Sequence, residues 1–320
     1  MIRSALVTGA SGFIGTALCK LLVEGEWRVV AAHRRASAQP ALVGIKQEYL
    51  PLSAESQRWQ DVLQSIDCVV HLAANVHQME RAGKLDAKFD EINVEGSRFV
   101  AQQCVRAGVK RLVFLSSIKV NGEGSNDHAY HAEDPPQPQG AYARTKLAAE
   151  IAIRDVCGPA GVEFVIIRPP LVYGPGVRAN FHRLLKMATH GLPLPFGSID
   201  NRRSLIGVRN LAGFIETCMT HPHAAGRVWL ISDGEDLSTT ELMRKLLRLM
   251  QKPDRLFACS TLWLRRVANL SGLGAEMSRL CDSLVVDATP AYERLSWRPS
   301  VSVDEELAVT VEAFRAERDR

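Results

Sequence analysis

Short apolar runs alternate with amphipathic stretches through the first half of the chain. An apolar run at 5–7 ends in glycines, residues 13–22 carry apolar side chains at helical spacing, and a second apolar run covers 27–32. Short apolar runs bounded by glycine are typical of parallel strands that are buried on both faces. The pattern therefore predicts a strand–helix–strand unit at the start of the chain.

The same alternation continues to about residue 170. Further strands are expected at 68–72, 111–115 and 164–167. The helices expected between the strands cover 57–66, 92–107 and 141–156. Repeated buried strands separated by helices predict an α/β fold, in which a doubly wound parallel sheet carries helices on both faces.

The pattern changes after Pro169 and Pro170. Helices are expected near 180–189, 210–220, 238–250, 260–270 and 304–317, with one more strand at 228–231. We therefore predict a sheet domain over 1–172 and a smaller, mostly helical C-terminal lobe over 173–320. About 204–233 of the lobe is expected to return to the sheet, so the two parts share an interface.

Composition narrows the classes of function without selecting one. The chain has 320 residues, 46% of them hydrophobic, and a net charge of +4, which is too mild to indicate a nucleic-acid partner. Seven scattered cysteines form no CxxC pair and the histidines lack metal-ligand spacing, so we expect no metal and a reducing, cytoplasmic location. We also expect neither a cleavable signal peptide nor a membrane span, which needs about 18 apolar residues in a row.

A glycine-rich turn joins the first predicted strand to the first predicted helix. Its sequence is Thr8-Gly9-Ala10-Ser11-Gly12-Phe13-Ile14-Gly15. Glycine permits a tight turn and lets the backbone approach a pyrophosphate at a helix N-terminus, where N–H groups and the helix dipole favour anions. The spacing is GxxGxxG rather than GxGxxG, but its context predicts a Rossmann-type dinucleotide site. The alternative is a turn without a ligand.

The end of the second predicted strand distinguishes the two nicotinamide dinucleotides. An NAD site usually has Asp or Glu there, which bonds the ribose 2′-OH. This chain has His33-Arg34-Arg35 instead. Because arginine binds a phosphate bidentately and an acid would repel it, these residues favour NADP. NAD is the alternative if the two arginines are only solvated surface charges.

Three side chains form a candidate catalytic set. Ser117 follows the strand at 111–115, while Tyr142 and Lys146 share one face of the next predicted helix. A phenol has a pKa near ~10, and a nearby ammonium together with the cofactor's positive charge lowers it. A serine hydroxyl can hold the same substrate oxygen. The set suits hydride transfer at a secondary alcohol carbon, with Tyr142 as the acid or base.

These motifs carry a family resemblance over essentially the whole chain. The chain resembles the extended short-chain dehydrogenase/reductases, the group that holds nucleotide-sugar epimerases, dehydratases and 4-keto reductases. The resembling segments are TGASGFIG (8–15), VVHLAA (69–74), NVEGS (93–97), LSSIKVNGE (115–123), YARTK (142–146), IIRPPLVYGPG (166–176), RSLIGVRNLA (203–212) and LSWRP (295–299). The resemblance implies an NAD(P)-binding domain at 1–172 and a substrate-binding lobe at 173–320.

The resemblance also assigns roles to single residues. It implies that Ser117, Tyr142 and Lys146 are the catalytic triad. The expected cofactor site comprises Gly9, Ser11, Gly12, Phe13, Ile14, Gly15, His33, Arg34, Arg35, Leu52, Leu72, Ala73, Ala74, Asn93, Tyr142, Lys146 and Pro169. The expected substrate site comprises Ser117, Asn121, Asn180, Arg203 and Arg209, of which Asn180 and Arg203 match positions that hold a nucleotide diphosphate. A basic surface loop is the alternative for the group Arg202, Arg203 and Arg209.

Two segments point to one reaction within the family. LSSIKVNGE and the ending SLVVDATPAYERLSWRP most resemble reductases of the UDP-N-acetylquinovosamine-forming type. With the NADP-type strand end, they favour NADPH-dependent reduction of the 4-keto group of a UDP-linked deoxysugar, with Tyr142 as proton donor. The alternative is a UDP-hexose or UDP-N-acetylhexosamine 4-epimerase with bound NAD. A reductase of a non-nucleotide carbonyl and a non-catalytic dinucleotide sensor are the remaining hypotheses.

Two surface expectations complete the interpretation. The stretch 260–270 carries Trp263, Arg265 and Arg266 in an amphipathic pattern. We expect a core-facing helix of the substrate lobe, with contact to a membrane surface or a membrane-bound partner as the alternative. The resemblance further implies a homodimer formed through the helices at 93–107 and 141–156.

Overall fold

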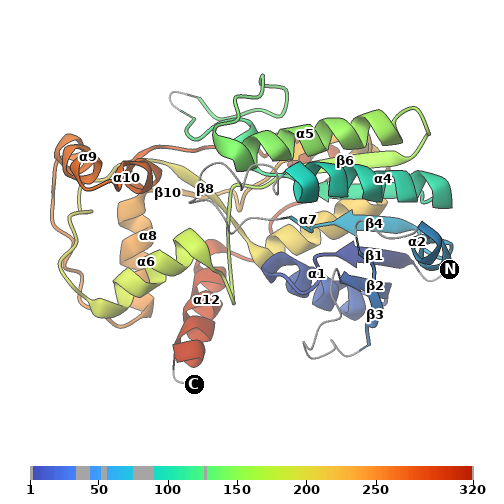
Figure 1. Ribbon diagram of the computed structural model, residues 1–320. Helices are drawn as coiled ribbons and strands as arrows, with labels where there is room; N and C mark the ends of the chain where they lie inside the picture. Colours follow the sequence, from blue (N-terminus) through green and yellow to red (C-terminus); the bar gives the residue numbers. More distant parts are fainter. Residues whose placement is uncertain (1–2, 34–43, 52–55, 75–89, 126–127, 319–320) are drawn as a thin grey trace.

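A seven-stranded parallel sheet forms the centre of the larger domain (Figure 1). The computed structural model describes residues 3–33, 44–51, 56–74, 90–125 and 128–318. The sheet has the order β3-β2-β1-β4-β5-β6-β9, and its neighbouring strands all pair in parallel. The strands are β1 Ser4–Thr8, β2 Arg28–His33, β3 Lys46–Tyr49, β4 Cys68–His71, β5 Arg111–Leu115, β6 Glu163–Arg168 and β9 Arg227–Leu230. The predicted α/β fold with a doubly wound parallel sheet is confirmed.

Helices cover both faces of this sheet (Figure 1). The helices α1 Phe13–Glu24, α7 Val208–Thr220 and α11 Thr289–Arg294 share one apolar core with the sheet, and α2 Ser56–Leu63, α4 Gly96–Ala107 and α5 Gly140–Cys157 share the other. Because successive side chains of a strand point to opposite faces, Ala5 and Val7 enter the first core while Leu6 enters the second. Burial on both faces explains why the strands read as unbroken apolar runs.

The smaller lobe has a sheet and a core of its own. The sheet has the order β10-β8-β7, formed by β7 Leu171–Tyr173, β8 Arg203–Gly207 and β10 Asp236–Leu237. The helices of the lobe are α6 Ala179–His190, α8 Thr239–Leu249, α9 Thr261–Leu270, α10 Gly274–Cys281 and α12 Val303–Arg318. Because β8 pairs with β7 and β10, the return of the chain to the large sheet begins only at α7 and is completed by β9.

Two details bear on the site. The helix predicted at 92–107 starts as a π-helix, η1 Asp90–Glu95, which continues into α4, and short 3₁₀ turns lie at η2 Ile118–Val120 and η3 Pro222–Ala224. Phe13 of the glycine-rich turn packs against the core of the smaller lobe, so the turn touches both parts of the molecule. Within the described ranges, no helix combines the length and the apolar composition that crossing a bilayer requires.

Candidate active site at the carboxyl edge of the large sheet

The glycine-rich turn is shaped by two close backbone approaches. Gly9 has a φ of +70°, and a Cβ atom on it would lie 2.9 Å from the backbone nitrogen of Ala73. A Cβ atom on Gly15 would lie 2.2 Å from the carbonyl oxygen of Gly9. Larger residues are therefore excluded at both positions, which seats the start of α1 directly against the loop after β4.

The N-terminus of α1 suits an anion. No side chain caps the helix, and its first turn holds no acidic residue. Ser11 and Gly12 are exposed, and a Cβ on Gly12 would meet only the carbonyl oxygen of Gly9. The first N–H groups of a helix lack intrahelical acceptors and carry the positive end of the dipole. The turn thus fits the pyrophosphate of a dinucleotide, as its sequence predicts.

Other residues expected at the cofactor lie along the same carboxyl edge of the strands. Leu72, Ala73 and Ala74 follow β4, where the backbone nitrogen of Ala73 donates to Thr8 Oγ1 at 3.3 Å. Pro169 follows β6, and its carbonyl oxygen accepts from the backbone nitrogen of Ile118 at 3.0 Å. Ligands of open α/β sheets bind at this edge.

The second-strand end is described only in part. His33 is the last residue of β2, and its Nε2 contacts Oε1 of Gln47 on β3. Arg34, Arg35 and Leu52, which the sequence also places at the cofactor, lie outside the described residues. A site for a 2′-phosphate at this end of β2 therefore stays a prediction.

Ser117 and Tyr142 meet at the start of α5. Ser117 follows β5 in extended conformation, and its Oγ accepts from the backbone nitrogen of Lys119 at 3.3 Å. The two hydroxyls share a hydrogen bond, which opposes the rise in the pKa of Tyr142. Burial outweighs this bond and raises that pKa to about 12, so the phenol is neutral without a further positive charge.

Lys146 is the buried cation of the set. Its side chain lies one turn along α5 from Tyr142, and only 3% of the residue is exposed. Its Nζ donates to the carbonyl oxygen of Leu115 at 2.7 Å and lies 4.5 Å above the ring of Phe114. Desolvation lowers the pKa of Lys146 to about 7, against the raising effect of Glu150. Ser117 and Tyr142 are thus in contact, and Lys146 lies one turn of α5 from Tyr142, while the assignment of the three as a catalytic triad stays a prediction.

A buried ion pair lies behind the triad. The carboxylate of Glu150 accepts from Arg168 Nε at 2.9 Å and from its Nη2 at 2.6 Å, and it also accepts from the Ser116 hydroxyl. Nη1 of Arg168 donates to Oδ1 of Asn121 at 2.9 Å, and Nδ2 of Asn121 donates to a backbone carbonyl. The Asn121 side chain, expected at the substrate, is therefore engaged in joining β6 to the loop after Ser117.

A second buried network ties the glycine-rich turn to the catalytic helix. Ser97 Oγ donates to the carbonyl oxygen of Asn93 at 2.6 Å and lies 3.0 Å from Nε2 of His71, so Nε2 carries the proton of that contact. Nδ1 of His71 is then the acceptor for the Thr8 hydroxyl at 2.7 Å. Nδ2 of Asn93 donates to Thr145 Oγ1 at 3.2 Å, next to Lys146. Asn93 lies in η1, and π-helical turns are frequent at functional sites.

Sequence reasoning missed most members of these two networks. Thr8, His71, Ser97 and Thr145 all stand within segments that carry the family resemblance, which is the one signal that could have indicated them. Arg168 stands in such a segment too, whereas Glu150 follows YARTK by one turn of α5.

The three arginines that the sequence places near one another, Arg202, Arg203 and Arg209, do not form one cluster. Arg203 starts β8, is half-buried, and donates from Nη1 to the carbonyl oxygen of Asp282 at 2.8 Å; desolvation lowers its pKa. Arg209 lies beyond the other end of β8 and pairs with Glu306 of α12. Arg202 is exposed and pairs with Asp236, while Asn180 is exposed in the first turn of α6.

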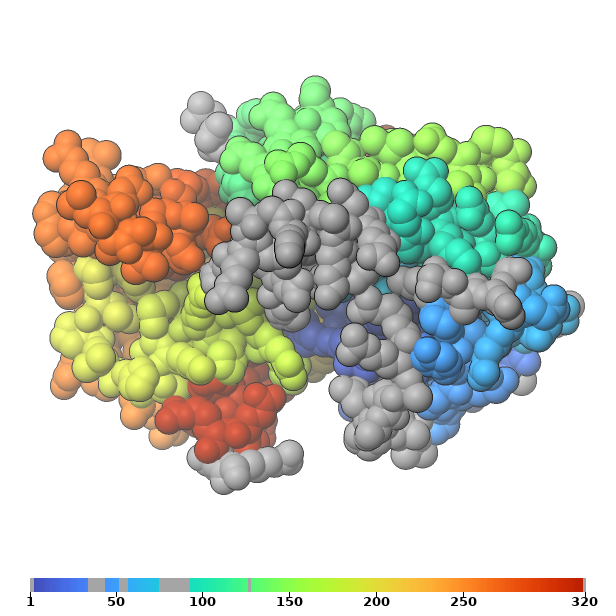
Figure 2. All heavy atoms as spheres, in the orientation of Figure 1, coloured from blue at the N-terminus to red at the C-terminus, as the bar shows by residue number. Residues whose placement is uncertain are grey.

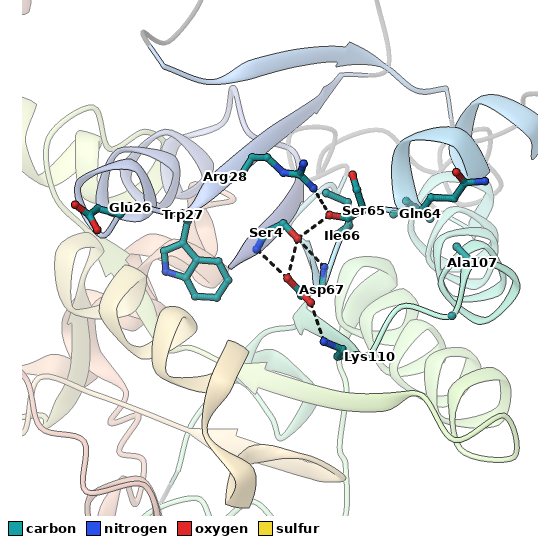
Figure 3. A pocket seen from close by; sticks show the side chains of 12 residues that line it. Ser4, Glu26, Trp27, Arg28, Gln64, Ser65, Ile66, Asp67, Ala107 and Lys110 are labelled. Carbon is teal, nitrogen blue, oxygen red and sulfur yellow. Dashed lines mark hydrogen bonds and ion pairs between the residues drawn. The ribbon is translucent and has the colours of Figure 1, made fainter. Parts of the chain in front are cut away.

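A polar cavity opens at the opposite, amino edge of the large sheet (Figure 3). Its walls include Ser4 at the start of β1 and Asp67 before β4. Asp67 accepts from the Ser4 hydroxyl at 2.8 Å and from Lys110 Nζ at 2.9 Å, and Arg28 donates to the carbonyl oxygen of Ser65. These groups satisfy one another, so the cavity is a feature of strand starts and not part of the catalytic site.

Comparison with known proteins agrees with this geometry. The model of the NAD dependent epimerase/dehydratase family matches residues 5–232. UDP-glucose 4-epimerase of Vibrio cholerae is 37% identical over 324 residues, which cover 100% of this chain and 98% of the relative. A 2-alkyl-3-oxoalkanoate reductase of Stenotrophomonas maltophilia is 30% identical over 94% of this chain and 96% of the relative. The solved structure of MoeE5 with UDP-glucuronic acid and NAD superposes with a TM-score of 0.78 at 26% identity, covering 98% and 99% of the two chains.

Proposed function

Because this chain belongs to the NAD dependent epimerase/dehydratase family, we propose that it interconverts the two C4 epimers of a UDP-linked hexose with NAD as its bound cofactor. The observation that carries the proposal is the full-length similarity to a UDP-glucose 4-epimerase. The sequence alone favoured a 4-keto reductase that uses NADPH. The comparisons favour the epimerase alternative, and the MoeE5 structure, which holds NAD and a UDP-sugar, supports NAD over NADP.

The reaction assigns one task to each residue of the triad. NAD, when bound, supplies the hydride acceptor for C4 of the sugar and the donor that returns the hydride. Tyr142 removes the proton from the C4 hydroxyl and later gives it back. Ser117, whose hydroxyl bonds that of Tyr142, holds the same substrate oxygen. Inversion then requires that the sugar present its other face before the proton and hydride return.

The electrostatics of Tyr142 and Lys146 suit this proton transfer. Burial disfavours the charged form of each residue when its neighbour is neutral. It raises the pKa of Tyr142 to about 12 and lowers the pKa of Lys146 to about 7. Formed together on one face of α5, the two opposite charges would stabilise each other. A general base works best when its pKa lies near the operating pH, and such a pairing would move the pKa of Tyr142 down toward it.

Arg203 is the best-suited group for the substrate diphosphate. It is half-buried, and among the described residues its guanidinium donates to one backbone carbonyl, which leaves N–H groups for phosphate oxygens. Asn180 in the exposed first turn of α6 is proposed as its companion. Arg209 is less suited, because Glu306 already accepts from it.

One observation favours a second candidate, the NADPH-dependent reduction of a carbonyl. His33 stands at the end of β2, where an acid would bond the ribose 2′-OH of NAD. The similarity to a 2-alkyl-3-oxoalkanoate reductase is compatible with this activity. Its carbonyl substrate would use the same Tyr142 as proton donor.

The two candidates differ in whether cofactor is consumed. The purified enzyme should convert UDP-glucose or UDP-N-acetylglucosamine into the C4 epimer, followed by proton NMR, without net change in absorbance at 340 nm. Denaturing the protein should release NAD. Stoichiometric oxidation of added NADPH with a UDP-4-keto sugar, and no epimer from either UDP-hexose, would replace the epimerase with the reductase.

We further propose a homodimer formed through α4 and α5. The two helices pack side by side on one face of the sheet (Figure 1), and Ile151 of α5 is 49% exposed. An exposed large apolar side chain on a helix pair suits an isologous contact. Ile151→Lys should convert the dimer to a monomer in light scattering, while Leu192→Ser, at another exposed apolar residue, should not. A monomeric parent protein would contradict the proposal.

A further inference from the structure

The outer end of the smaller lobe exposes apolar side chains that the proposed reaction does not use. Nine large apolar residues are exposed in the described part of the chain, and six of them lie between 257 and 273. The six are Phe257, Leu262, Trp263, Val267, Leu270 and Leu273, with Leu270 90% exposed and Leu262 71% exposed. A concentrated apolar surface of this kind marks an interaction site.

Helix α9 is apolar on two opposite sides. Leu264 and Ala268 are buried, and Leu264 belongs to the core of the lobe. Leu262, Trp263 and Leu270 point away from that core, and Trp263 is 58% exposed. The helix faces the core of the lobe through Leu264 and Ala268, as expected, but Trp263 lies on its outer side. The helix needs only one of its apolar sides for folding, which leaves the outer side for a partner.

The charged residues of α9 itself, Arg265 and Arg266, are both basic. Between 255 and 275 the chain contains Arg255, Arg265 and Arg266 and neither Asp nor Glu. Arg266 is exposed in the middle of the apolar face, between the directions of Leu262 and Leu270 on the helix. Arg265 pairs with Asp282 and so fastens α9 to the lobe. An apolar face with cationic groups and an exposed tryptophan is the composition of helices that lie in a membrane interface.

We propose that the outer face of α9, formed by Leu262, Trp263, Arg266, Val267 and Leu270, binds the surface of an anionic lipid bilayer. The helix lies in the plane of the interface, with its apolar side chains among the acyl chain ends. Arg266 extends its apolar stem across the face and brings its guanidinium to the lipid phosphates. A ten-residue helix is about 15 Å long, so this is a surface contact and not a span.

Charge distinguishes this occupant from a second copy of the chain. A twofold contact through this face would place the same patch on both sides, with Arg266 of each copy at its centre. Like charges opposed in a desolvated contact are unfavourable. An anionic bilayer offers the complementary charge instead, together with apolar depth for four side chains.

Helix α9 is linked to the proposed substrate site. The carbonyl oxygen of Asp282 accepts from Arg203, the proposed diphosphate ligand, and its carboxylate accepts from Arg265 of α9. Arg265 and Asp282 thus connect α9 to Arg203 of the proposed substrate site. Docking would hold the enzyme beside membrane-bound proteins that consume a nucleotide-activated sugar.

The test uses the full-length protein and vesicles of phosphatidylglycerol and phosphatidylcholine in equal parts, without substrate. Of the five tryptophans, only Trp263 is substantially exposed, since Trp27, Trp59, Trp229 and Trp297 are each 8% exposed or less. Tryptophan emission should therefore shift to shorter wavelength on binding, and Trp263→Phe should abolish the shift while co-sedimentation persists. Binding should weaken about tenfold at about 0.5 M salt and on vesicles of phosphatidylcholine alone.

The double variant Leu262→Ser/Leu270→Ser should lose vesicle binding by about tenfold or more, since each leucine contributes most of its side chain to the face. Leu192→Ser is the matched control, because Leu192 is 60% exposed elsewhere on the same lobe. This variant should bind vesicles as the parent does.

Figure 2 shows the α9 region, in orange, at the end of the molecule.

Two results would overturn the proposal. In the first, the parent and the double variant bind vesicles equally, or neither binds. In the second, the parent protein is an oligomer and the double variant is a monomer. Both are independent of the proposed reaction, since the assay contains no sugar nucleotide. Turnover of a soluble UDP-hexose should be unchanged in the double variant.

Discussion

The carboxyl edge of the large sheet and the outer end of the smaller lobe depart from ordinary burial in opposite directions. The edge buries charges: Lys146, Glu150 and Arg168 are each 3% exposed or less. The lobe end exposes apolar groups, with Leu270 90% in solvent. Charged residues are rarely buried and large apolar residues rarely gather on a surface. Both departures cost stability, and each points to a contact with something outside the chain.

The two regions also differ in how completely their groups are satisfied. Around the triad, Glu150 has partners in Arg168 and Ser116, and Arg168 has a third acceptor in Asn121. Such a network ties the ends of β5 and β6 to α5, the helix that carries Tyr142 and Lys146, before a ligand arrives. The α9 face has no corresponding partner for its apolar groups within the described residues. The first region is prepared for chemistry, and the second for association.

The largest effect is expected at Tyr142, where Tyr142→Phe removes the proton carrier and keeps the ring. Turnover should fall about 10³-fold or more, because general acid–base catalysis contributes this order of rate. Cofactor content and thermal unfolding should stay at the parent level, since Ser117 is the one hydrogen-bond partner of the phenol oxygen among the described residues. Activity within tenfold of the parent, measured by NMR of the epimers, would remove Tyr142 from the mechanism.

Lys146→Met should abolish turnover and yet stabilise the cofactor-free protein. The folded pKa of Lys146 is about 7 against an ordinary value of 10.5, so below about pH 7 the folded state carries a buried ammonium. Between about pH 7 and 10.5 only the unfolded chain still binds that proton. The folded state then no longer bears the free-energy cost of a buried ammonium. The gain over the parent should therefore be larger at about pH 6 than at about pH 10, by up to about 4 kcal/mol at ~1.36 kcal/mol per pKa unit. Urea unfolding at the two pH values measures it; a gain independent of pH would contradict the lowered pKa.

Glu150→Gln should destabilise the protein by about 3 kcal/mol, because it leaves the buried Arg168 without its counter-charge. Glu276→Gln is the control, since Glu276 forms an exposed pair with Arg183, and exposed pairs contribute about 1 kcal/mol or less. Comparable losses in both variants, by urea unfolding at neutral pH, would show that the buried pair behaves like a surface pair.

The smallest effect is expected at the substrate arginines. Arg203→Ala should raise KM for the UDP-hexose about tenfold or more with kcat within about threefold, because it removes binding that is uniform along the reaction. Arg209→Ala should change KM by less than about threefold, since its partner is Glu306. If steady-state kinetics showed the larger rise in KM for Arg209→Ala, Arg209 and not Arg203 would be the diphosphate ligand.

Much of the catalytic region could be predicted because its signals are local. The glycine turn and the Tyr142–Lys146 spacing each fall within eight residues, and the short apolar runs of the buried strands can be recognised directly. The polar networks could not be predicted, because their members come from distant segments: His71 and Ser97 are 26 residues apart, and Arg168 and Asn121 are 47 apart. Hydrogen-bond partners at such separations depend on the register of the whole sheet.

The edge strand β3 and the orientation of α9 could not be predicted from the sequence for a different reason. β3, Lys46–Tyr49, is a mostly exposed edge strand and lacks the apolar run that identified the others. On α9, helical periodicity indicates apolar sides but not which of them the rest of the fold covers. Only the packing of Leu264 and Ala268 decides that Trp263 faces outward.

The central claim is that the triad removes and returns a hydride at one carbon within one site. The direct test is to incubate the purified enzyme with a UDP-hexose that carries deuterium at C4, without added cofactor, and to follow the label by NMR. The C4 epimer should appear with its deuterium retained, and the enzyme should turn over many times. An absence of epimer, or an epimer formed with loss of the label, would contradict it.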